Sequence, residues 1–156
     1  MVRVEVSLDP GEMAIAACVG AGRQRQALAK GYENKHGFRG LGWSEHIEGA
    51  AGEMAVAKHF GMYWGGAYNS WKGADLGKNI QVRTRSEPWH ELIVRDDDSD
   101  DDVFVLVTGR APNFVLHGWI LGRDAKAPSW HQSHGNRPPA YFISPDYLKP
   151  MDSLKP

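Results

Sequence analysis

Two segments decide the fold of this chain, SEHIEGAAGEMAVAKHF (residues 44–60) and IQVRTR (residues 80–85). Apolar residues recur through the first segment at the spacing of one helix face: Ile47, Ala50, Ala51, Met54 and Ala57. The second segment alternates apolar and polar side chains, as a half-buried strand does. We therefore expect a helix over residues 45–60, capped by Ser44 and ended by Gly61, and a strand over residues 80–85.

An earlier helix is predicted from the sequence Asp9-Pro10-Gly11-Glu12. Asp9 suits the cap, Pro10 suits the first helical position, and Glu12 completes a capping box. The helix is expected to run to about Lys30, because Gly31 is a typical stop. A short strand is expected before it, since apolar residues occupy alternate positions: Val2, Val4, Val6 and Leu8.

Downstream of the second helix the sequence becomes rich in β-branched and aromatic residues, which predicts strands. The expected strands cover residues 62–68, 80–85, 91–94, 103–108, 114–121 and 141–143. The aspartate-rich run at 96–102 is expected to join two of them as a solvated hairpin tip. The predicted class is α+β or mixed α/β, with two N-terminal helices followed by a mostly antiparallel mixed sheet, all in one domain over residues 1–156.

Length and composition fit one globular domain. The chain has 156 residues, of which 42% are hydrophobic and 24% charged, and this excludes wholesale disorder. Its single cysteine, Cys18, excludes an internal disulfide and a four-cysteine zinc site and indicates a reducing setting. No stretch is long and apolar enough for a membrane span, and no signal-peptide core is present, so we expect a cytoplasmic protein without a membrane partner.

The net charge of -1 hides an uneven distribution. Six of the 19 acidic residues lie within 96–102, which leaves 13 acids against 18 Lys and Arg elsewhere in the chain. The body of the protein is therefore mildly basic, which is compatible with a polyanionic partner without requiring one.

The helix over 45–60 carries a glutamate, Glu53, at the edge of its apolar stripe. Gly49 lies one turn before it and Gly52 directly precedes it. Glycine inside a helix costs about 1 kcal/mol relative to alanine, which indicates that something approaches this helix closely. Glu53 is either a structural side chain at the edge of the core or part of a site.

The strand over 80–85 places three long polar side chains on one face, with an aspartate, Asp75, preceding them. These side chains are Gln81, Arg83 and Arg85, whereas Ile80, Val82 and Thr84 face the other way. The polar face is either an ordinary solvated edge or a site. A carboxylate, an amide oxygen and a cation at one strand end suit a hard metal ion beside a phosphate.

Together these residues resemble the PD-(D/E)XK nuclease superfamily. The resemblance covers residues 44–85 and rests on three motifs: GAAGEMAVA (49–57), GAD (73–75) and QVRTR (81–85). In that family a helix glutamate, often in a Gly-x-x-Gly-Glu setting, precedes an aspartate at a strand end and then a Glu-x-Lys strand. The C-terminal half, including Gly118-Trp119-Ile120, resembles small phage-encoded proteins of unassigned role.

The resemblance implies a restriction-endonuclease-like core and a hydrolase that cleaves DNA phosphodiester bonds with Mg²⁺ or Mn²⁺, as an endo- or exodeoxyribonuclease. The implied metal ligands are Glu53, Asp75 and Gln81, with the Val82 carbonyl as a further ligand. Arg83 matches the lysine position, so the implied catalytic set is Glu53, Asp75, Gln81 and Arg83.

Two departures from the family pattern leave a second hypothesis open. Glutamine at position 81 keeps an oxygen ligand but removes a charge. Arginine at position 83 can clamp a phosphate with two hydrogen bonds, yet it cannot act as a base near neutral pH. The alternative is a catalytically degenerate module of this fold that binds nucleic acid or a host protein.

The remaining candidates are residues that surround this site in the sequence. Lys72, Lys78 and Arg85 suit phosphate contacts, and the alternative for them is an ordinary solvated surface. His46, two turns before Glu53 on the same helix face, is either a supporting partner or a satisfied helix histidine. DNA is expected as partner in preference to RNA, and the oligomeric state, monomer or homodimer, stays open.

Overall fold

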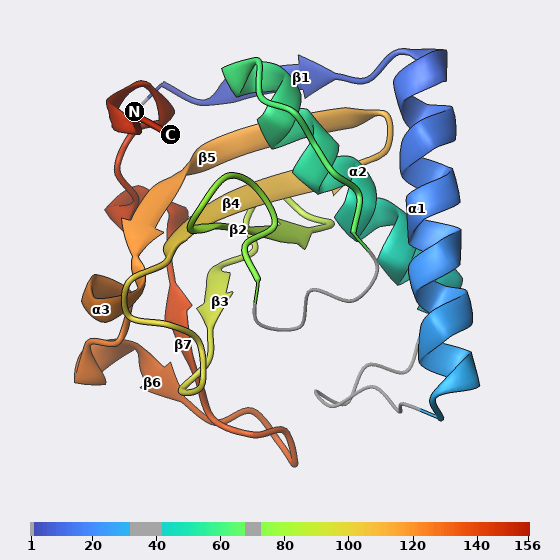
Figure 1. Cartoon of the computed structure of the whole chain (residues 1–156). Coiled ribbons are helices and arrows are strands. Elements are labelled where there is room, and N and C mark those ends of the chain that lie inside the picture. The colour runs from blue at the N-terminus through green and yellow to red at the C-terminus, as the bar shows by residue number, and fades with distance from the viewer. Residues whose placement is uncertain (1, 32–41, 68–72) are drawn as a thin grey trace.

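The computed structural model describes residues 2–31, 42–67 and 73–156 of the chain and has a mixed α+β fold (Figure 1). The helices are α1 (Pro10–Ala29), α2 (Gly42–Phe60) and the short α3 (Gly122–Ala125). The strands are β1 (Val4–Ser7), β2 (Ile80–Arg85), β3 (Leu92–Val94), β4 (Val103–Arg110), β5 (Asn113–Leu121), β6 (His131–Gln132) and β7 (Ala140–Ile143). Among these described residues, no helix has the length and apolar character needed to cross a membrane.

Helix α1 begins as its sequence predicts. The Asp9 side chain accepts a hydrogen bond from the backbone N–H of Glu12, and the Glu12 side chain accepts one from the backbone N–H of Asp9, which is the predicted capping box. Gly31 follows the helix with φ +66°. Helix α2 begins at Gly42, so the prediction of Ser44 as its cap is wrong and Ser44 lies in the first turn.

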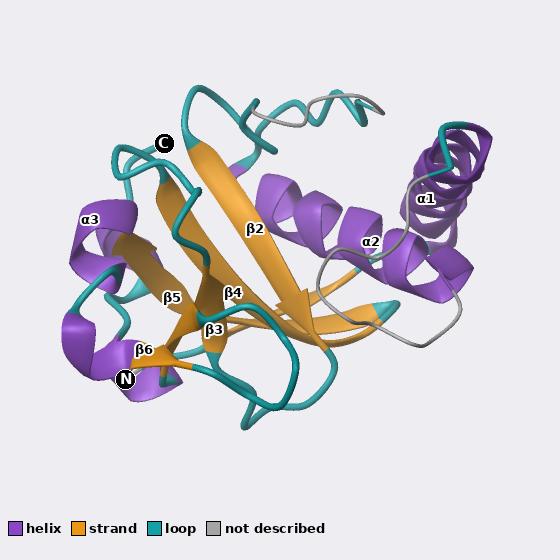
Figure 2. Ribbon diagram, turned by 90° about the horizontal axis from the view of Figure 1, so that it is seen from below, coloured by secondary structure: helices purple, strands orange, loops and turns teal. Residues whose placement is uncertain are grey.

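A four-stranded mixed sheet in the order β1-β5-β4-β2 forms the centre of the fold. Strand β2 pairs in parallel with β4, from Ile80 opposite Val103 to Arg85 opposite Thr108, and the other pairings are antiparallel. Helix α2 covers one face of this sheet, and α1 crosses α2 on its outer side (Figure 2). The prediction of a mostly antiparallel mixed sheet is confirmed. Strand β1, which precedes both helices in the sequence, joins this sheet at its edge next to β5.

A second sheet, in the order β3-β7-β6, lies beside the first and was not predicted. Strand β3 pairs with β7, and β3 and β4 lie in different sheets, so the prediction of a hairpin through residues 96–102 is wrong. The predicted strand over 62–68 is wrong in its described part, residues 62–67, which form an extended loop. Gly66 in this loop has φ +58°, a conformation that interrupts a strand.

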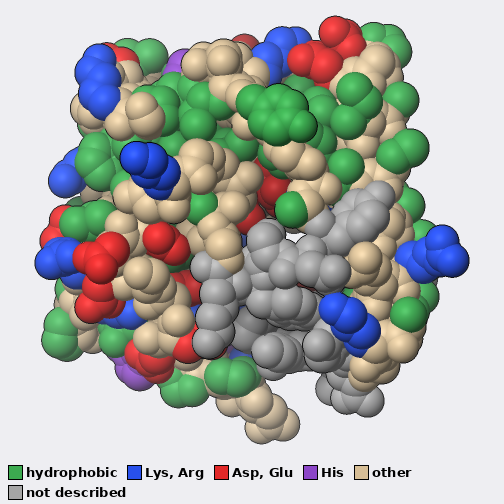
Figure 3. Space-filling model, viewed as in Figure 1, with side chains coloured by type: hydrophobic (Ala, Val, Ile, Leu, Met, Phe, Trp, Pro, Cys, Tyr) green, Lys and Arg blue, Asp and Glu red, His purple; other side chains and the backbone are tan. Residues whose placement is uncertain are grey.

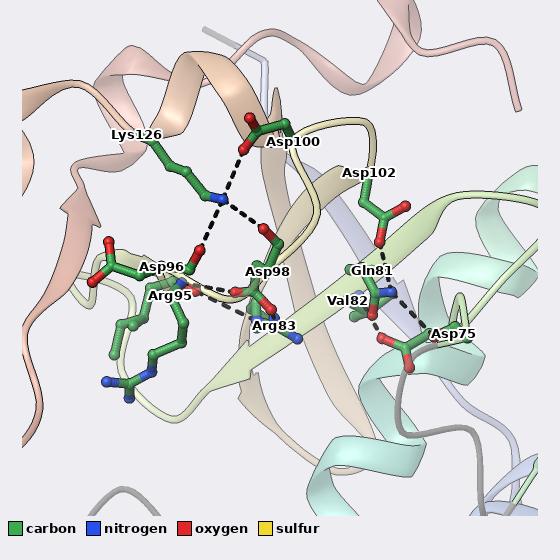
Figure 4. A network of polar contacts seen from close by, with 12 residues as sticks. Asp75, Gln81, Val82, Arg83, Arg95, Asp96, Asp98, Asp100, Asp102 and Lys126 are labelled. Atoms are coloured by element: carbon green, nitrogen blue, oxygen red, sulfur yellow. Dashed lines mark hydrogen bonds and ion pairs between the residues drawn. The ribbon is translucent and has the colours of Figure 1, made fainter.

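The aspartate-rich run forms a loop between the two sheets, and ion pairs hold it in place (Figure 4). The Lys126 ammonium donates to the backbone carbonyls of Asp96, at 3.2 Å, and Asp98, at 2.5 Å, and to the Asp100 carboxylate, at 2.7 Å. Arg123 pairs with Asp101. The loop is solvated as predicted, since Asp96, Asp97, Asp100 and Asp101 are exposed, and a lysine 24 residues or more along the chain supplies counter-charge that the sequence did not reveal.

Replacing Lys126 with methionine is expected to lower the free energy of unfolding by about 1–2 kcal/mol, because the carbonyls and carboxylate that surround the ammonium lose their donor. The side chain of Lys126 is 18% exposed, so water replaces the lost donor only in part. Urea unfolding measures the change. Arg123→Met, at a side chain that is 57% exposed, is the matched control and is expected to cost less than about 0.5 kcal/mol. Equal costs for the two variants would contradict a structural role for the lysine.

Candidate functional site

The crossing of α1 over α2 brings Arg23 to Glu53. Gly20 lies at the closest approach of the two helices, where a Cβ atom on Gly20 would lie 2.7 Å from the Ile47 backbone nitrogen. Arg23 is one turn further along α1, and Glu53 is less than two turns further along α2. A glycine at the contact therefore sets the position of both charged side chains.

Glu53 is held by three hydrogen bonds and is 6% exposed. Arg23 pairs with it through both terminal nitrogens, Nη1 to Oε2 at 2.6 Å and Nη2 to Oε1 at 2.9 Å. The Trp64 indole Nε1 donates to Oε1 at 3.2 Å. The third guanidinium nitrogen, Nε of Arg23, donates to the Ala67 carbonyl at 2.9 Å. Glu53 is therefore a buried carboxylate in an ion pair, and it does not pass the core to reach water.

Asp75 lies against the open edge of β2, on the side away from β4. The chain folds back there, with the backbone N–H groups of Asp75 and Leu76 donating to the Ile80 carbonyl at 2.9 and 3.1 Å. Gly77, with φ +55°, makes the tight turn between them possible. The Asp75 carboxylate accepts a hydrogen bond from the Val82 backbone N–H at 2.8 Å, which fixes it beside the strand.

The pKa of the Asp75 carboxyl group is raised from its ordinary value of 3.8 to about 6. Burial is the main cause, because it removes water from the charged form, and the negative charge of Glu53 is the next. The Val82 hydrogen bond and the charges of Arg83 and Arg23 act in the opposite direction and are weaker. The two carboxylates are thus close enough to repel each other, and such a pair attracts a cation.

A pocket of about 350 Å³ opens beside this carboxylate pair. Arg23 and Asp75 are the charged residues that line it. The other lining residues come from two loops: Tyr63, Gly65, Gly66, Ala67, Ala74, Leu76 and Gly77. Figure 3 shows acidic atoms recessed below the surrounding surface on this face of the molecule. The pocket places a guanidinium and a carboxylate within reach of one small polar ligand.

Gln81 and Arg83 point to the face of β2 opposite α2, as the alternation of the strand predicts (Figure 4). The Gln81 amide nitrogen donates to the Gly73 carbonyl at 3.1 Å and to the Asp102 carboxylate at 3.0 Å. Figure 4 shows Gln81 next to Asp75 along the strand edge. Asp75 therefore lies between Glu53 on one side of β2 and Gln81 on the other.

Arg83 forms an ion pair with the aspartate-rich loop at residues 96–102. Its Nη2 pairs with the Asp98 carboxylate at 2.8 Å, and its guanidinium carbon lies 5.0 Å from the centre of the Phe104 ring. Its side chain is 30% exposed. The residue at the lysine position of the family pattern is thus directed along the strand, away from Asp75 (Figure 4).

Four arginines gather near the strand face that carries Arg83: Arg83, Arg85, Arg95 and Arg137. Arg85 donates to the Glu91 carbonyl at 2.9 Å, and burial together with the charges of Arg137 and Arg95 lowers its pKa. The pKa of Arg95 is lowered by burial and by the charges of Arg83 and Arg137, although Asp98 and Asp97 oppose this shift. Within the described chain, no carboxylate forms an ion pair with Arg85, Arg95 or Arg137. The negative charge of Glu91 acts on Arg85, and those of Asp98 and Asp97 act on Arg95, without forming ion pairs with them.

The other predicted residues lie around this site. Lys78 is exposed in the turn between Leu76 and β2. Lys72 lies outside the described residues. His46 is half-buried on α2. Its burial and the positive charge of Arg23 lower its pKa, so the His46 ring lies close enough to Arg23 to feel that charge.

The donor types near Asp75, which are carboxylate, amide and carbonyl oxygens, are those that Mg²⁺ accepts, although both Glu53 oxygens are bonded to Arg23. Among residues 2–31, 42–67 and 73–156 there is no group of three or more His, Cys, Asp or Glu side chains placed to hold a metal. A metal site here needs amide or carbonyl oxygen beside its carboxylates. Asp75 and Glu53 repel each other, and Gln81 and the Val82 carbonyl add the neutral oxygens that Mg²⁺ accepts.

Sequence reasoning missed Arg23, Trp64 and Asp98. Arg23 had a detectable signal, because Ala16, Gly20 and Arg23 follow one another at helical spacing, and the first two are buried. Trp64 fell in a segment wrongly predicted as a strand. Asp98 had no signal, since six similar aspartates lie within seven residues.

In comparisons with known proteins, no family model, no curated protein and no solved structure matches this chain.

Proposed function

We propose that this protein is a metal-dependent nuclease that hydrolyses DNA phosphodiester bonds at Asp75. The observation that carries the proposal is the pair of carboxylates Asp75 and Glu53: burial and then the charge of Glu53 raise the pKa of Asp75, beside a pocket that Arg23 also lines. The order of helix, aspartate at a strand edge, and strand with Gln81 and Arg83 supports a restriction-endonuclease-like core.

In this proposal Asp75, Glu53, Gln81 and the Val82 carbonyl would hold Mg²⁺ or Mn²⁺, and the metal would supply an activated water and positive charge for the phosphate. The chain's own residues bind and orient the substrate. Asp75 is fixed by the Val82 N–H, and Gln81 by Gly73 and Asp102, so both enter the reaction in defined positions. Arg83 takes a phosphate contact at the strand rather than a proton-transfer role.

The arginine group on β2 supports a nucleic-acid partner. Arg85, Arg95 and Arg137 lie near one another without carboxylate ion pairs among the described residues, and Arg83 extends the row toward Gln81. Contacts from arginines to phosphates position a nucleic acid without reading its sequence. We infer DNA binding along this face, with the scissile phosphate at the edge of β2.

The second candidate is a module of the same fold that binds nucleic acid without cleaving it. One specific observation favours it: the charged residues at two catalytic positions are already paired inside the protein, Glu53 with Arg23 and Arg83 with Asp98. The candidate predicts binding that falls steeply with salt and needs no divalent metal.

Incubation of the purified protein with plasmid and with single-stranded DNA tests the proposal, in Mg²⁺, in Mn²⁺ and in EDTA. Cleavage that requires the metal and is absent from an Asp75→Asn preparation is the expected result. Equal cleavage by both preparations indicates a contaminating nuclease and defeats the proposal. Metal-independent binding without cleavage supports the second candidate.

Replacing Arg95 with alanine is expected to weaken binding to a short fluorescent DNA, measured by anisotropy in EDTA, and to lower the slope of log K against log salt by about one. Arg137→Ala should behave in the same way. Arg123→Ala is the matched control, because Arg123 already has a carboxylate partner, Asp101. A slope that stays constant in both test variants contradicts phosphate contacts at these arginines.

A further inference from the structure

The Arg23–Glu53 contact is the least exposed ion pair between described residues, with 16% and 8% of the two side chains exposed. It is bidentate, which is the strongest geometry that a guanidinium and a carboxylate form. Arg23 is further fixed by the Ala67 carbonyl. Glu53 therefore already has a positively charged partner, and each of the three nitrogens of that guanidinium donates a hydrogen bond.

The position of that partner matters because Arg23 also lines the pocket at Asp75. Two carboxylates share this region with the Arg23 guanidinium, which bonds to Glu53 through both terminal nitrogens. The Asp75 carboxylate accepts a hydrogen bond from the Val82 backbone N–H. A divalent cation that approached both carboxylates would meet the positive charge of Arg23 first.

We propose that Arg23 is the resident counter-cation of this site, so that a divalent metal binds Asp75 and Glu53 together only when Arg23 is displaced from Glu53. The proposal rests on the proposed metal site and assigns its regulation to a residue on α1. Metal binding and release of Arg23 are then one coupled exchange. The released guanidinium stays on the wall of the pocket, where it can pair with a substrate phosphate.

The exchange lowers the affinity of the protein for the metal by an amount that can be measured. A ligand that binds only the minor state of a protein shows an affinity reduced by the population of that state. If the ion pair is broken in about one molecule in ten or fewer, the metal affinity of the wild-type protein is about tenfold or more below that of a protein without Arg23. Arg23 is a positioning residue in this account, and the affinity for metal is its direct readout.

Calorimetric titration with Mn²⁺, in the absence of DNA, tests the exchange. Arg23→Gln removes the charge, and its amide can still donate one hydrogen bond to Glu53. We expect Mn²⁺ to bind this variant about tenfold or more tightly than the wild type. Arg25→Gln, two residues along the same helix at an exposed position, is the matched control and should leave the affinity unchanged. Adding Glu53→Gln to Arg23→Gln should remove the gain, because the ligand that Arg23 blocks is then absent.

A wild-type measurement keeps the test independent of how well the variant folds. The Nε–H signal of Arg23 in the nitrogen-15 spectrum, assigned by its loss in Arg23→Lys, is expected to shift on addition of Mg²⁺ as the Ala67 and Glu53 contacts change. An unchanged or weaker Mn²⁺ affinity in Arg23→Gln overturns the proposal, and so does an Arg23 signal that stays in place while Mg²⁺ binds. Absence of Mn²⁺ binding in both proteins also overturns it. Binding without cleavage leaves the exchange standing and defeats only the proposed nuclease.

Discussion

Replacing Asp75 with asparagine is expected to have two opposite effects, a loss of cleavage of at least about 100-fold and a gain in the stability of the fold. The loss corresponds to about 2.7 kcal/mol of transition-state stabilisation, because the charged ligand at the centre of the site is gone. The gain follows from the burial of the same charge. The asparagine oxygen can still accept the Val82 N–H, so the edge of β2 keeps its contact.

The stability gain depends on pH in a defined direction. The pKa of Asp75 is raised on folding from 3.8 to about 6, so the folded chain binds this proton more tightly than the unfolded chain does. The free energy of unfolding of the wild type therefore falls as the pH rises from about 4 to about 6 and stays lower above that, by on the order of 2–3 kcal/mol from this group. Asp75→Asn lacks the titration and should be the more stable protein at about pH 8, with the difference closing toward about pH 4.

Urea unfolding at several pH values, without divalent metal, measures this difference. Asp124→Asn, the same substitution at an exposed position on α3, is the control and should change neither cleavage nor the pH dependence of stability. An Asp75→Asn variant that is less stable than the wild type at every pH would mean that the Asp75 carboxylate stabilises the fold. That result would contradict a cation site at Asp75.

The sequence predicted those parts of the fold that depend on local signals. The capping box at Asp9, the alternation in β2 and the apolar stripe of α2 are local patterns, and each element is present in the structure. Asp75, which precedes β2 in the sequence, lies at the edge of the strand that carries Gln81. Whether these residues hold a metal stays a prediction.

Long-range contacts explain what the sequence did not predict. Nothing near the acidic run in the sequence shows that Lys126, at the end of α3, binds this exposed loop, or that Arg83 is paired with Asp98 and not free to contact a phosphate. The second sheet follows from the pairing of β3 with β7, which are separated by nearly fifty residues. The partner of Glu53 depends on the crossing of α1 and α2, a tertiary feature that Gly20 permits and no local pattern specifies.

Gly52 and Gly49 lie one turn apart on α2 but differ in their surroundings, and alanine is expected to act in opposite directions at the two positions. A Cβ atom on Gly52 would overlap the Thr84 hydroxyl oxygen of β2 and lie 3.0 Å from the Thr84 Cβ, so the close approach expected from the sequence is present here. Gly49 has no described atom within 4 Å of such a Cβ. Gly52→Ala should lower the free energy of unfolding by at least about 2 kcal/mol through overpacking against the strand. Gly49→Ala should raise it by about 1 kcal/mol through helix propensity alone.

The Thr84 side chain gives this prediction its internal control. Its hydroxyl oxygen is buried without a hydrogen-bond partner among the described residues, so removing it in Thr84→Ala sacrifices no hydrogen bond within the described structure. The double variant Gly52→Ala/Thr84→Ala should recover much of the stability lost in Gly52→Ala, and urea unfolding of the four proteins forms a double-mutant cycle. Because Gly52 directly precedes Glu53, the single variant should also move Glu53 relative to Arg23 and change the Mn²⁺ affinity. Stability losses that simply add across the cycle would place the strain of Gly52→Ala somewhere other than the contact between α2 and β2.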